Sequence, residues 1–453
     1  MASLGWRLLE GKAGYRLALP KLSEEECGLV LACAKRIASR AETTEAPGTA
    51  GARQAALDAV LLECERQGLE IDSEQREYLA SSVYRKTYGL GFLDELLADG
   101  SLEEIALCGI GKPVFVFARK EGWKRTNVCI DSQDYFVSLV NRLGRGLGRR
   151  LTAQQPRLNA TLPDGSRLHA SMPPVSECEL TIRKFGPEPL SAFDLIGLGT
   201  YDAKMLSLLS LCMQSDMAVL VCGNTASGKT TTLNALLSFL PSSERILIIE
   251  ETPEISIPHP HQVRLLPFEE GGIGMVWLVR DSLRMRPDRV VVGEVRSSEE
   301  AKAFAESALS GQAKGSYATF HAQSSRDAMA RLSMMGCLES DLEGIGLFIV
   351  QRRVSVYDRA RRKIGEQRKV TEIAIANPES HMKPMPVHIG GRFTHALRML
   401  HSGICKGTGM GMGEVRKELA LREGFFRQGI GKGGAQGPAA FGRIQEFLFG
   451  GGK

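Results

Sequence analysis

The sequence lacks several features that would assign it to a familiar class of protein. No two of its 10 cysteines are spaced as C-x-x-C, which argues against a zinc site built from paired knuckles. Scattered thiols favour a reducing cytosol over a secreted disulfide framework. No apolar run is long enough to span a bilayer, and residues 1–12 hold no apolar core followed by a small-residue cleavage site. We therefore expect a cytoplasmic protein, and any work at a membrane would require a partner that holds it there.

Aromatic residues are also scarce, at 6% of the chain, and the net charge is a mild +5. A nucleic-acid motor needs a basic channel lined by aromatic side chains, and no basic and aromatic block stands out here. Nucleic acid is therefore not expected as a partner, whereas an acidic partner or an anionic membrane surface is compatible with the charge. A chain of 453 residues is too long for one core and predicts about two to four domains.

The order of apolar and turn-forming residues predicts five segments. A helical region is followed by a small mixed α/β domain, a linker rich in proline and glycine, a larger α/β domain, and a small helical region with a disordered tail. The larger domain alternates apolar strands with helices, which predicts a mostly parallel sheet covered by helices. The expected ranges are 1–92, 93–190, 191–199, 200–376 and 377–453.

Individual elements follow from local patterns. Residues 23–26 have the pattern of a capping box that begins a helix, and residues 132–143 carry apolar side chains at i, i+3, i+4 and i+7. Two short apolar runs around glycines, 105–108 and 114–117, predict a hairpin. Further along the chain, strands are expected at 217–222, 245–250, 289–293 and 316–320, and a helix at 413–426.

Residues 223–230, GNTASGKT, match the phosphate-binding pattern G-x-x-x-x-G-K-[ST] in full. Glycines let successive N–H groups point into one concavity that binds phosphate oxygens. An apolar run precedes the motif and a helical repeat follows it, so the bare alternative, a glycine-rich turn without a ligand, is disfavoured. Lys229 is expected to meet the β- and γ-phosphates of ATP, and Thr230 to ligate Mg²⁺. The expected nucleotide-binding residues are Gly223, Asn224, Thr225, Ala226, Ser227, Gly228, Lys229, Thr230 and Thr231.

Acidic residues follow two of the expected strands, at the end where ligands bind in open α/β sheets. Glu294 is expected to orient or deprotonate the attacking water, directly or through Mg²⁺. The alternative for Glu294 is a structural ion pair with Arg296 or Arg289. Glu250 and Glu251 are expected to hold the water shell of Mg²⁺, although polar residues in a loop need no special reason.

His321 follows another expected strand. A single histidine is often a satisfied core residue, but its place at a strand end makes it a candidate sensor of the γ-phosphate. The catalytic candidates from these strand ends are therefore Glu294, Glu250, Glu251 and His321, and the expected metal ligands are Thr230, Glu251 and Glu294.

Taken in order, these motifs resemble the type II/IV secretion ATPase family, most of all its branch for archaeal archaellum and pilus assembly. The acidic box, Walker B strand and histidine box of the family correspond to residues 246–255, 284–301 and 315–322. The Walker B strand ends in Gly-Glu rather than the usual Asp, which is distinctive of the family. The resemblance covers about residues 93–372, and segments 101–117, 162–170 and 180–185 resemble the N-terminal domain of the family.

The resemblance implies a RecA-like P-loop NTPase domain that follows a smaller mixed α/β domain, in a homohexameric ring that hydrolyses ATP with Mg²⁺. It implies that Arg167 and Arg183 reach the phosphates as further catalytic residues. It also implies a cytoplasmic motor at the inner face of the cell membrane. Such a motor would act through a polytopic membrane platform protein, and would move pilin-like cargo indirectly in filament assembly or protein secretion.

The sequence departs from the family pattern at two positions. Glu251 stands where relatives usually have Asp, and Ser316 stands where many carry a first histidine. Two other functions stay open: a RecA-like nucleic-acid motor for DNA transfer or unwinding, and a nucleotide-gated scaffold with negligible turnover. The intact set of Lys229, Thr230 and Glu294 argues against the scaffold.

Overall fold

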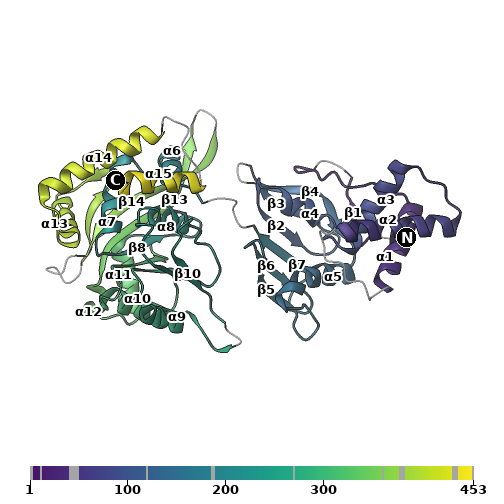
Figure 1. Cartoon of the computed structure of the whole chain (residues 1–453), viewed down its shortest axis with the longest axis horizontal. Coiled ribbons are helices and arrows are strands. Elements are labelled where there is room, and N and C mark those ends of the chain that lie inside the picture. The colour runs from purple at the N-terminus through teal and green to yellow at the C-terminus, as the bar shows by residue number, and fades with distance from the viewer. Residues whose placement is uncertain are drawn as a thin grey trace. The chain divides into compact units, whose positions relative to one another are not determined.

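The chain divides into two compact units, Met1–Pro187 and Glu188–Lys453, in a computed structural model (Figure 1). Each unit has a hydrophobic core of its own. The residues that the structure describes are 4–10, 13–39, 50–118, 121–184, 189–268, 271–359, 362–376, 383–430 and 437–450.

The first unit is built on an antiparallel sheet with strand order β1-β4-β3-β2-β7-β6-β5. Helices α1, α2 and α3 contact one another, and their apolar residues belong to the same core as the strands. The elements are β1 Trp6–Leu8, α1 Glu24–Ser39, α2 Ala50–Gln67, α3 Ser73–Thr87, α4 Leu93–Ala98, β2 Leu102–Cys108, β3 Pro113–Ala118, β4 Gly122–Ile130, α5 Gln133–Gly144, β5 Arg157–Thr161, β6 Arg167–Ser171 and β7 Glu179–Arg183.

Several elements of this unit were predictable from local pattern and are confirmed. The Glu26 N–H donates to Ser23 Oγ at 3.2 Å, and the Ser23 N–H donates to the Glu26 carboxylate at 2.8 Å, as the capping box requires. Ser132 caps α5 by accepting a hydrogen bond from the Tyr135 N–H. Strands β2 and β3 pair as the expected hairpin. The expected helical region 1–92, however, shares one core with the α/β segment after it, because helices with one apolar face need another layer to cover that face.

The second unit contains a mixed sheet with strand order β10-β9-β11-β12-β8-β13-β14-β15-β16 in the described residues. The strands from β10 to β13 run parallel, and β14 to β16 continue the sheet antiparallel. The elements are α6 Ala192–Gly197, α7 Ala203–Gln214, β8 Ala218–Gly223, α8 Lys229–Leu237, β9 Ile246–Ile249, β10 Gln262–Leu265, α9 Met275–Ser282, β11 Arg289–Val295, α10 Ser298–Leu309, β12 Gly315–Phe320, α11 Ser325–Met334, α12 Glu339–Leu342, β13 Ile345–Asp358, β14 Lys363–Ile375, β15 Met385–Ile389, β16 Arg392–Phe393, α13 Leu397–Thr408, α14 Met412–Ile430 and α15 Gly437–Phe449.

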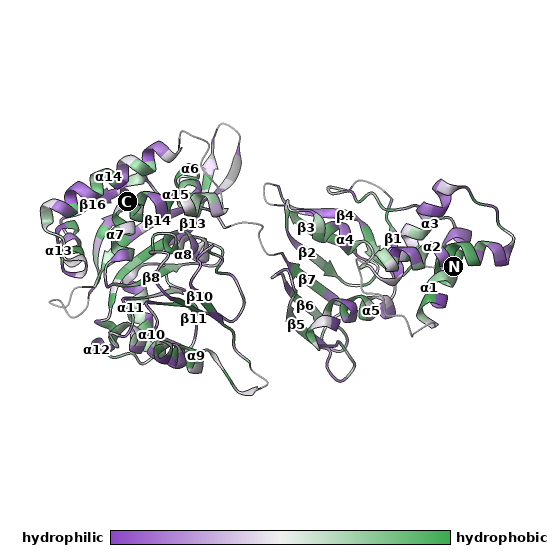
Figure 2. Ribbon diagram, in the orientation of Figure 1, coloured by the Kyte–Doolittle hydropathy of each residue, from purple (hydrophilic) through white to green (hydrophobic). Residues whose placement is uncertain are grey.

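This sheet is buried on both faces, because helices cover each of them. Along β8, Val219 and Val221 join the core formed with α7, α8 and α14, whereas Leu220 and Cys222 join the core formed with α10 and α11. A strand covered on both faces reads as an unbroken apolar run, which is why the sequence identified it. Figure 2 shows the strands at the centre of this unit in the hydrophobic colour.

The segment expected as a small helical region over 377–453 contributes to the second unit in two ways. β15 and β16 extend the main sheet, and helices α13, α14 and α15 bury residues such as Leu400, Phe426 and Ile444 in its core. The helix expected at 413–426 is confirmed as part of α14. The last three positions of the expected disordered tail lie outside the described residues.

Candidate functional site

The phosphate-binding loop joins β8 to α8, as the motif requires. Ala226 and Gly228 have φ angles of 58° and 93°, so the loop turns through the left-handed region twice. Gly223 is fixed by close packing, since a Cβ there would lie 2.2 Å from the Gln351 carbonyl oxygen and 2.4 Å from Ser227 Oγ. The loop is therefore a backbone cradle that only a glycine-rich sequence can form.

The side chains of the motif divide between the interior and the surface. Ser227 is fully buried, and its Oγ has no hydrogen-bond partner among the described residues. Lys229 is 8% exposed at the start of α8. Asn224, Thr230 and Thr231 are half-buried, while Thr225 and Ala226 are exposed. A buried, unpartnered hydroxyl and a buried ammonium at a loop of this shape suit phosphate oxygens.

Residues from β13 and β14 hold this loop from one side. The Gln351 amide donates to the Ser227 carbonyl at 2.7 Å, and its oxygen accepts from the Thr232 hydroxyl. Arg368 Nε donates to the Ala226 carbonyl at 3.0 Å. Sequence reasoning missed these supports because they lie more than a hundred positions from the motif. One feature of the sequence could have indicated Gln351, namely that this polar residue directly follows the apolar run 345–350.

Three charged or titratable side chains meet at the ends of adjacent strands. Glu294 Oε1 lies 2.9 Å from His321 Nε2 and 3.7 Å from Lys229 Nζ, and Lys229 Nζ lies 3.3 Å from His321 Nε2. The pairing of β11 with β12 is irregular between Val292 and Val295, where Glu294 sits. Such irregularities re-aim side chains next to functional sites. The structure thus brings together three of the residues predicted from the sequence.

The electrostatics of this cluster keep Glu294 ionised. Burial alone would raise the pKa of Glu294, but a hydrogen bond of 2.6 Å and the charge of Arg296, followed by Lys229 and His321, hold it below its usual range. Burial and the nearby Lys229 ammonium lower the pKa of His321. Glu294 is therefore a carboxylate acceptor at neutral pH, and His321 is a neutral imidazole beside it.

Arg296 links two acidic segments, because its guanidinium contacts both Glu294 and Glu251. The alternative interpretation of Glu294 as an ion-pair partner of Arg296 therefore describes a real contact. That contact coexists with the contacts to Lys229 and His321. Arg289, the other candidate partner, lies elsewhere and pairs with Glu244 at 2.7 Å.

The acidic segment after β9 is arranged differently from the expectation. The Glu250 carboxylate is buried and accepts the N–H groups of Glu254 and Ile255, at 2.8 and 3.0 Å. Burial raises the pKa of Glu250 in spite of those bonds and of Arg264. Glu250 therefore holds the loop in shape. Glu254, in the same loop, accepts a 2.9 Å hydrogen bond from the Thr230 hydroxyl.

A hydroxyl and a carboxylate oxygen side by side are the hard oxygen ligands that suit Mg²⁺. The Thr230 and Glu254 pair therefore fits the metal that the phosphate-binding loop implies. Glu251 lies instead against Arg296. Among the described residues, no group of three or more His, Cys, Asp or Glu could hold a metal ion.

The two predicted arginines belong to the first unit. Arg167 on β6 and Arg183 on β7 are direct cross-strand partners, and Arg183 also pairs in register with Glu104 on β2. The Arg183 charge opposes the rise that burial causes in the pKa of Glu104. The two cations thus lie together on one sheet, and their approach to the phosphates stays a prediction.

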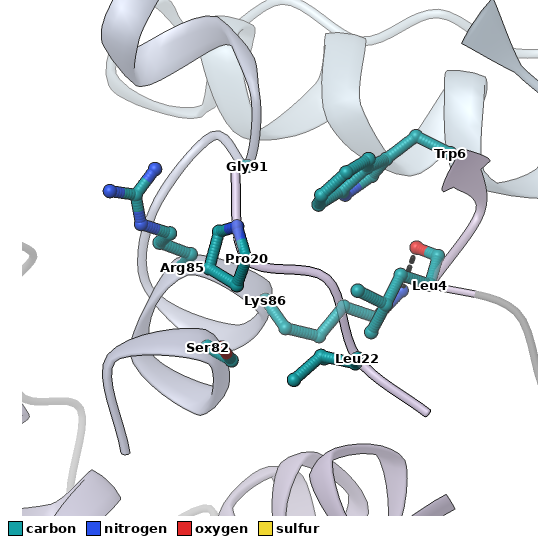
Figure 3. A pocket seen from close by; sticks show the side chains of 8 residues that line it. All are labelled: Leu4, Trp6, Pro20, Leu22, Ser82, Arg85, Lys86 and Gly91. Atoms are coloured by element: carbon teal, nitrogen blue, oxygen red, sulfur yellow. Dashed lines mark hydrogen bonds between the residues drawn. The ribbon is translucent and has the colours of Figure 1, made fainter. Parts of the chain in front are cut away.

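The first unit also holds a small cavity of about 10 Å³, lined by residues such as Leu4, Trp6, Pro20 and Leu22 (Figure 3). Lys86 Nζ donates to the Leu4 carbonyl at 2.7 Å across it. That volume suits about one water molecule, so the cavity is a packing defect rather than a ligand site.

No helix in the described part of the chain is long and apolar enough to cross a membrane.

A mixed sheet whose central strands run parallel, with a phosphate-binding loop at its centre and acids at the ends of neighbouring strands, defines a P-loop nucleotide-binding protein. More narrowly, this chain belongs to the Type II/IV secretion system protein family, whose sequence model matches residues 129–394. The family expected from the sequence is thereby confirmed.

Relatives come from archaea and bacteria. An uncharacterized protein of Methanocaldococcus jannaschii is 35% identical over 273 residues, which cover 58% of this chain and 49% of that protein. A second protein of that organism is 38% identical over 234 residues, or 49% of this chain and 32% of its own length. The match thus spans half or less of each archaeal relative. The type IV secretion system protein PtlH of Bordetella pertussis is 33% identical over 269 residues, covering 53% of this chain and 78% of that protein.

Two solved structures are similar to part of this chain. The pilus retraction motor PilT with bound ADP has a TM-score of 0.48 and 19% identity, covering 64% of this chain and 84% of that one. The VirB11 ATPase of the Brucella suis type IV secretion system has a TM-score of 0.32 and 23% identity, covering 62% of this chain and 92% of that one.

Proposed function

We propose that this protein is an ATP-hydrolysing motor that works as a homohexameric ring. Its work would be to power assembly of a type IV pilus-like filament, such as a pilus or an archaellum, or protein secretion, through a membrane platform partner. The observation that carries the proposal is the convergence of Lys229, Glu294 and His321 beside the phosphate-binding loop. Membership of the secretion ATPase family supports it.

The chain's own residues suggest a division of labour in hydrolysis. Lys229 would hold the β- and γ-phosphates, and the ionised Glu294 would orient the attacking water and accept its proton as the bond from the γ-phosphorus to the bridging oxygen breaks. Neutral His321 could donate to a γ-phosphate oxygen. Bound Mg²⁺ would neutralise phosphate charge, with Thr230 and Glu254 nearby to hold it. Arg167 and Arg183 would add cationic charge to the transition state.

The test is Mg-dependent ATP hydrolysis by the native protein beside Lys229→Ala and Glu294→Gln, each sized by light scattering. Glu299→Gln is the matched control, because Glu299 is an exposed acid in the first turn of α10. We expect the native protein and the control to turn over ATP, Lys229→Ala to lose ATP binding, and Glu294→Gln to bind ATP while losing about 10²-fold or more in rate.

The same assay separates the other functions. If native turnover equals that of Glu294→Gln in ring form and with lipid present, the protein is a nucleotide-gated scaffold and the proposal is wrong. Stimulation of turnover by single-stranded DNA would instead favour a nucleic-acid motor. Mutation of Arg167 or Arg183 to Ala should slow turnover without loss of folding if these residues reach the phosphates.

A further inference from the structure

The charge of the chain is concentrated in one short segment. Residues 352–369, here named the basic ribbon, contain eight Lys or Arg and two Asp or Glu, so their net charge is +6. The whole chain carries +5, so all other residues together carry −1. A mild overall charge therefore hides a strongly cationic element.

In the part of the chain that the structure describes, the basic ribbon forms two strands, 352–358 and 363–369, that pair only with each other. β8 pairs with β13 only up to Gln351, and β15 pairs with β14 only from Glu372 onwards. Between these limits the two strands pair with each other. The side chains of Arg352, Arg353 and Arg368 are exposed there, as are those of Arg359, Arg362 and Lys369. In Figure 1 the light-green ribbon extends beyond the sheet, and Figure 2 colours it mainly hydrophilic.

Two successive cross-strand pairs of the ribbon join like charges. Arg352 lies opposite Lys369, and Arg353 lies opposite Arg368. Like charges placed directly opposite destabilise a strand pair, and a two-stranded hairpin in water is marginal to begin with. Glu366 offsets part of this, 3.7 Å from Arg353. An anionic surface against the ribbon would relieve the repulsion.

Apolar side chains lie near the far end of the ribbon. Val356 is 39% exposed and Tyr357 is 58% exposed, although both are large hydrophobic residues. In the sequence, arginines stand before and after Val356 and Tyr357, and the second strand of the ribbon also carries arginine. Tyrosine beside basic residues is the composition of segments that enter the headgroup region of a bilayer. One tyrosine in 18 positions gives no stacking platform of the kind that single-stranded nucleic acid needs.

We propose that the basic ribbon binds anionic phospholipid headgroups at a membrane surface. Arginine guanidinium groups donate two hydrogen bonds in parallel to phosphate, which suits the exposed arginines in the described part of the ribbon. Val356 and Tyr357 enter the headgroup region of the bilayer between the arginine side chains. Lipid binding by this surface does not require ATP hydrolysis. It can therefore be measured without nucleotide, and its result does not depend on whether the proposed function is correct.

The test is sedimentation of the full-length protein with vesicles of phosphatidylcholine alone or with phosphatidylglycerol added. The ribbon variant combines Arg352→Gln, Arg359→Gln and Lys369→Gln. The matched control combines Arg398→Gln, Arg416→Gln and Lys417→Gln, because these residues are exposed on α13 and α14 and carry the same charge. We expect the native protein and the control to bind the anionic vesicles, and the ribbon variant to bind at least about tenfold more weakly.

Salt and protease supply independent readouts. Binding should weaken strongly from about 0.1 M to about 1 M salt, as the Debye length falls from roughly 10 Å to roughly 3 Å. If the ribbon variant does not fold, protection of the native ribbon from trypsin by anionic vesicles replaces it. Equal binding by native protein and ribbon variant, or no protection, overturns the proposal. Binding of duplex or single-stranded DNA that the ribbon variant loses, without vesicle binding, also overturns it and assigns the ribbon to nucleic acid.

Discussion

The hydroxyl of Thr230 and the carboxylate of Glu254 are joined by a hydrogen bond of 2.9 Å. Asn234 of α8 stabilises this arrangement, since its amide donates to the Glu254 carbonyl and accepts from the Ser256 N–H. The helix that begins at the phosphate-binding loop therefore fixes the acid that faces its own first turn. The expected ligand Glu251 is directed instead to Arg296.

The first prediction concerns the choice between these two acids. Glu254→Gln should weaken Mg-dependent nucleotide binding by about tenfold, because a charged oxygen next to Thr230 is lost. Glu251→Gln should have a smaller effect, since its partner Arg296 is exposed and screened. Calorimetric titration with ADP, with and without Mg²⁺, measures both. A larger loss in Glu251→Gln would return the metal role to Glu251.

The second prediction concerns the support of the loop. Gln351→Ala should leave the buried Ser227 carbonyl and the Thr232 hydroxyl without this partner, which costs about 1–3 kcal/mol of unfolding free energy. Nucleotide affinity should fall as well, because the loop loses a fixed shape. Urea unfolding and ADP titration check the two effects. Unchanged affinity in a destabilised protein would show that Gln351 serves the core alone.

The third prediction concerns the approach of two strands. A Cβ at Gly293 would lie 2.7 Å from the Glu250 Cβ, so Gly293→Ala should cost about 1–3 kcal/mol through overpacking. In Gly424→Ala, on α14, the new Cβ meets nothing within 4 Å, so this control should be neutral or stabilising by up to about 1 kcal/mol. Thermal unfolding compares the two. Equal melting temperatures would mean that the strand ends adjust without cost.

The fourth prediction concerns pH and the buried pair of Glu244 with Arg289. Burial would raise the pKa of Glu244, but the hydrogen bond and charge of Arg289, then those of Lys314, lower it below its ordinary value of 4.5. A depressed folded pKa contributes stability above about pH 4.5, and that stability is lost as pH falls through the folded pKa. Glu244→Gln should therefore cost roughly 2–4 kcal/mol near pH 7 and less near pH 3.

Urea unfolding at both pH values measures this difference. Lys314→Met is the control, because Lys314 is half exposed and its pair should contribute less than about 1 kcal/mol. A cost for Glu244→Gln that stays constant with pH would mean that hydrogen bonding, and not charge, carries the contribution of Glu244.

Much of the fold and part of the site were predictable because they depend on local pattern. The apolar run before the motif, the glycines within it and the helix after it are adjacent in sequence, so one stretch predicts all three. Glu294 and His321 were found because parallel strands end at one edge of the sheet. Their mutual contact follows from that topology.

The remainder depends on register and on tertiary packing. Nothing in the acidic segment distinguishes Glu254 from Glu251, because the turn that selects between them is held by the buried Glu250 carboxylate. The supports Gln351 and Arg368 come from strands far away in the sequence. Likewise, the N-terminal helices have the composition of an independent region, and only the shared core shows that they pack together with the sheet.

The strand that carries the phosphate-binding loop lies in the interior of the sheet, with β12 on one side and β13 on the other. The acids and His321 all arrive from the β12 side, whereas Gln351 and Arg368 arrive from the β13 side. The titratable side chains and the residues that hold the loop in shape therefore reach the loop from opposite sides. Arg368 belongs both to the basic ribbon and to the residues that hold the loop, so these two features of the second unit share one side chain.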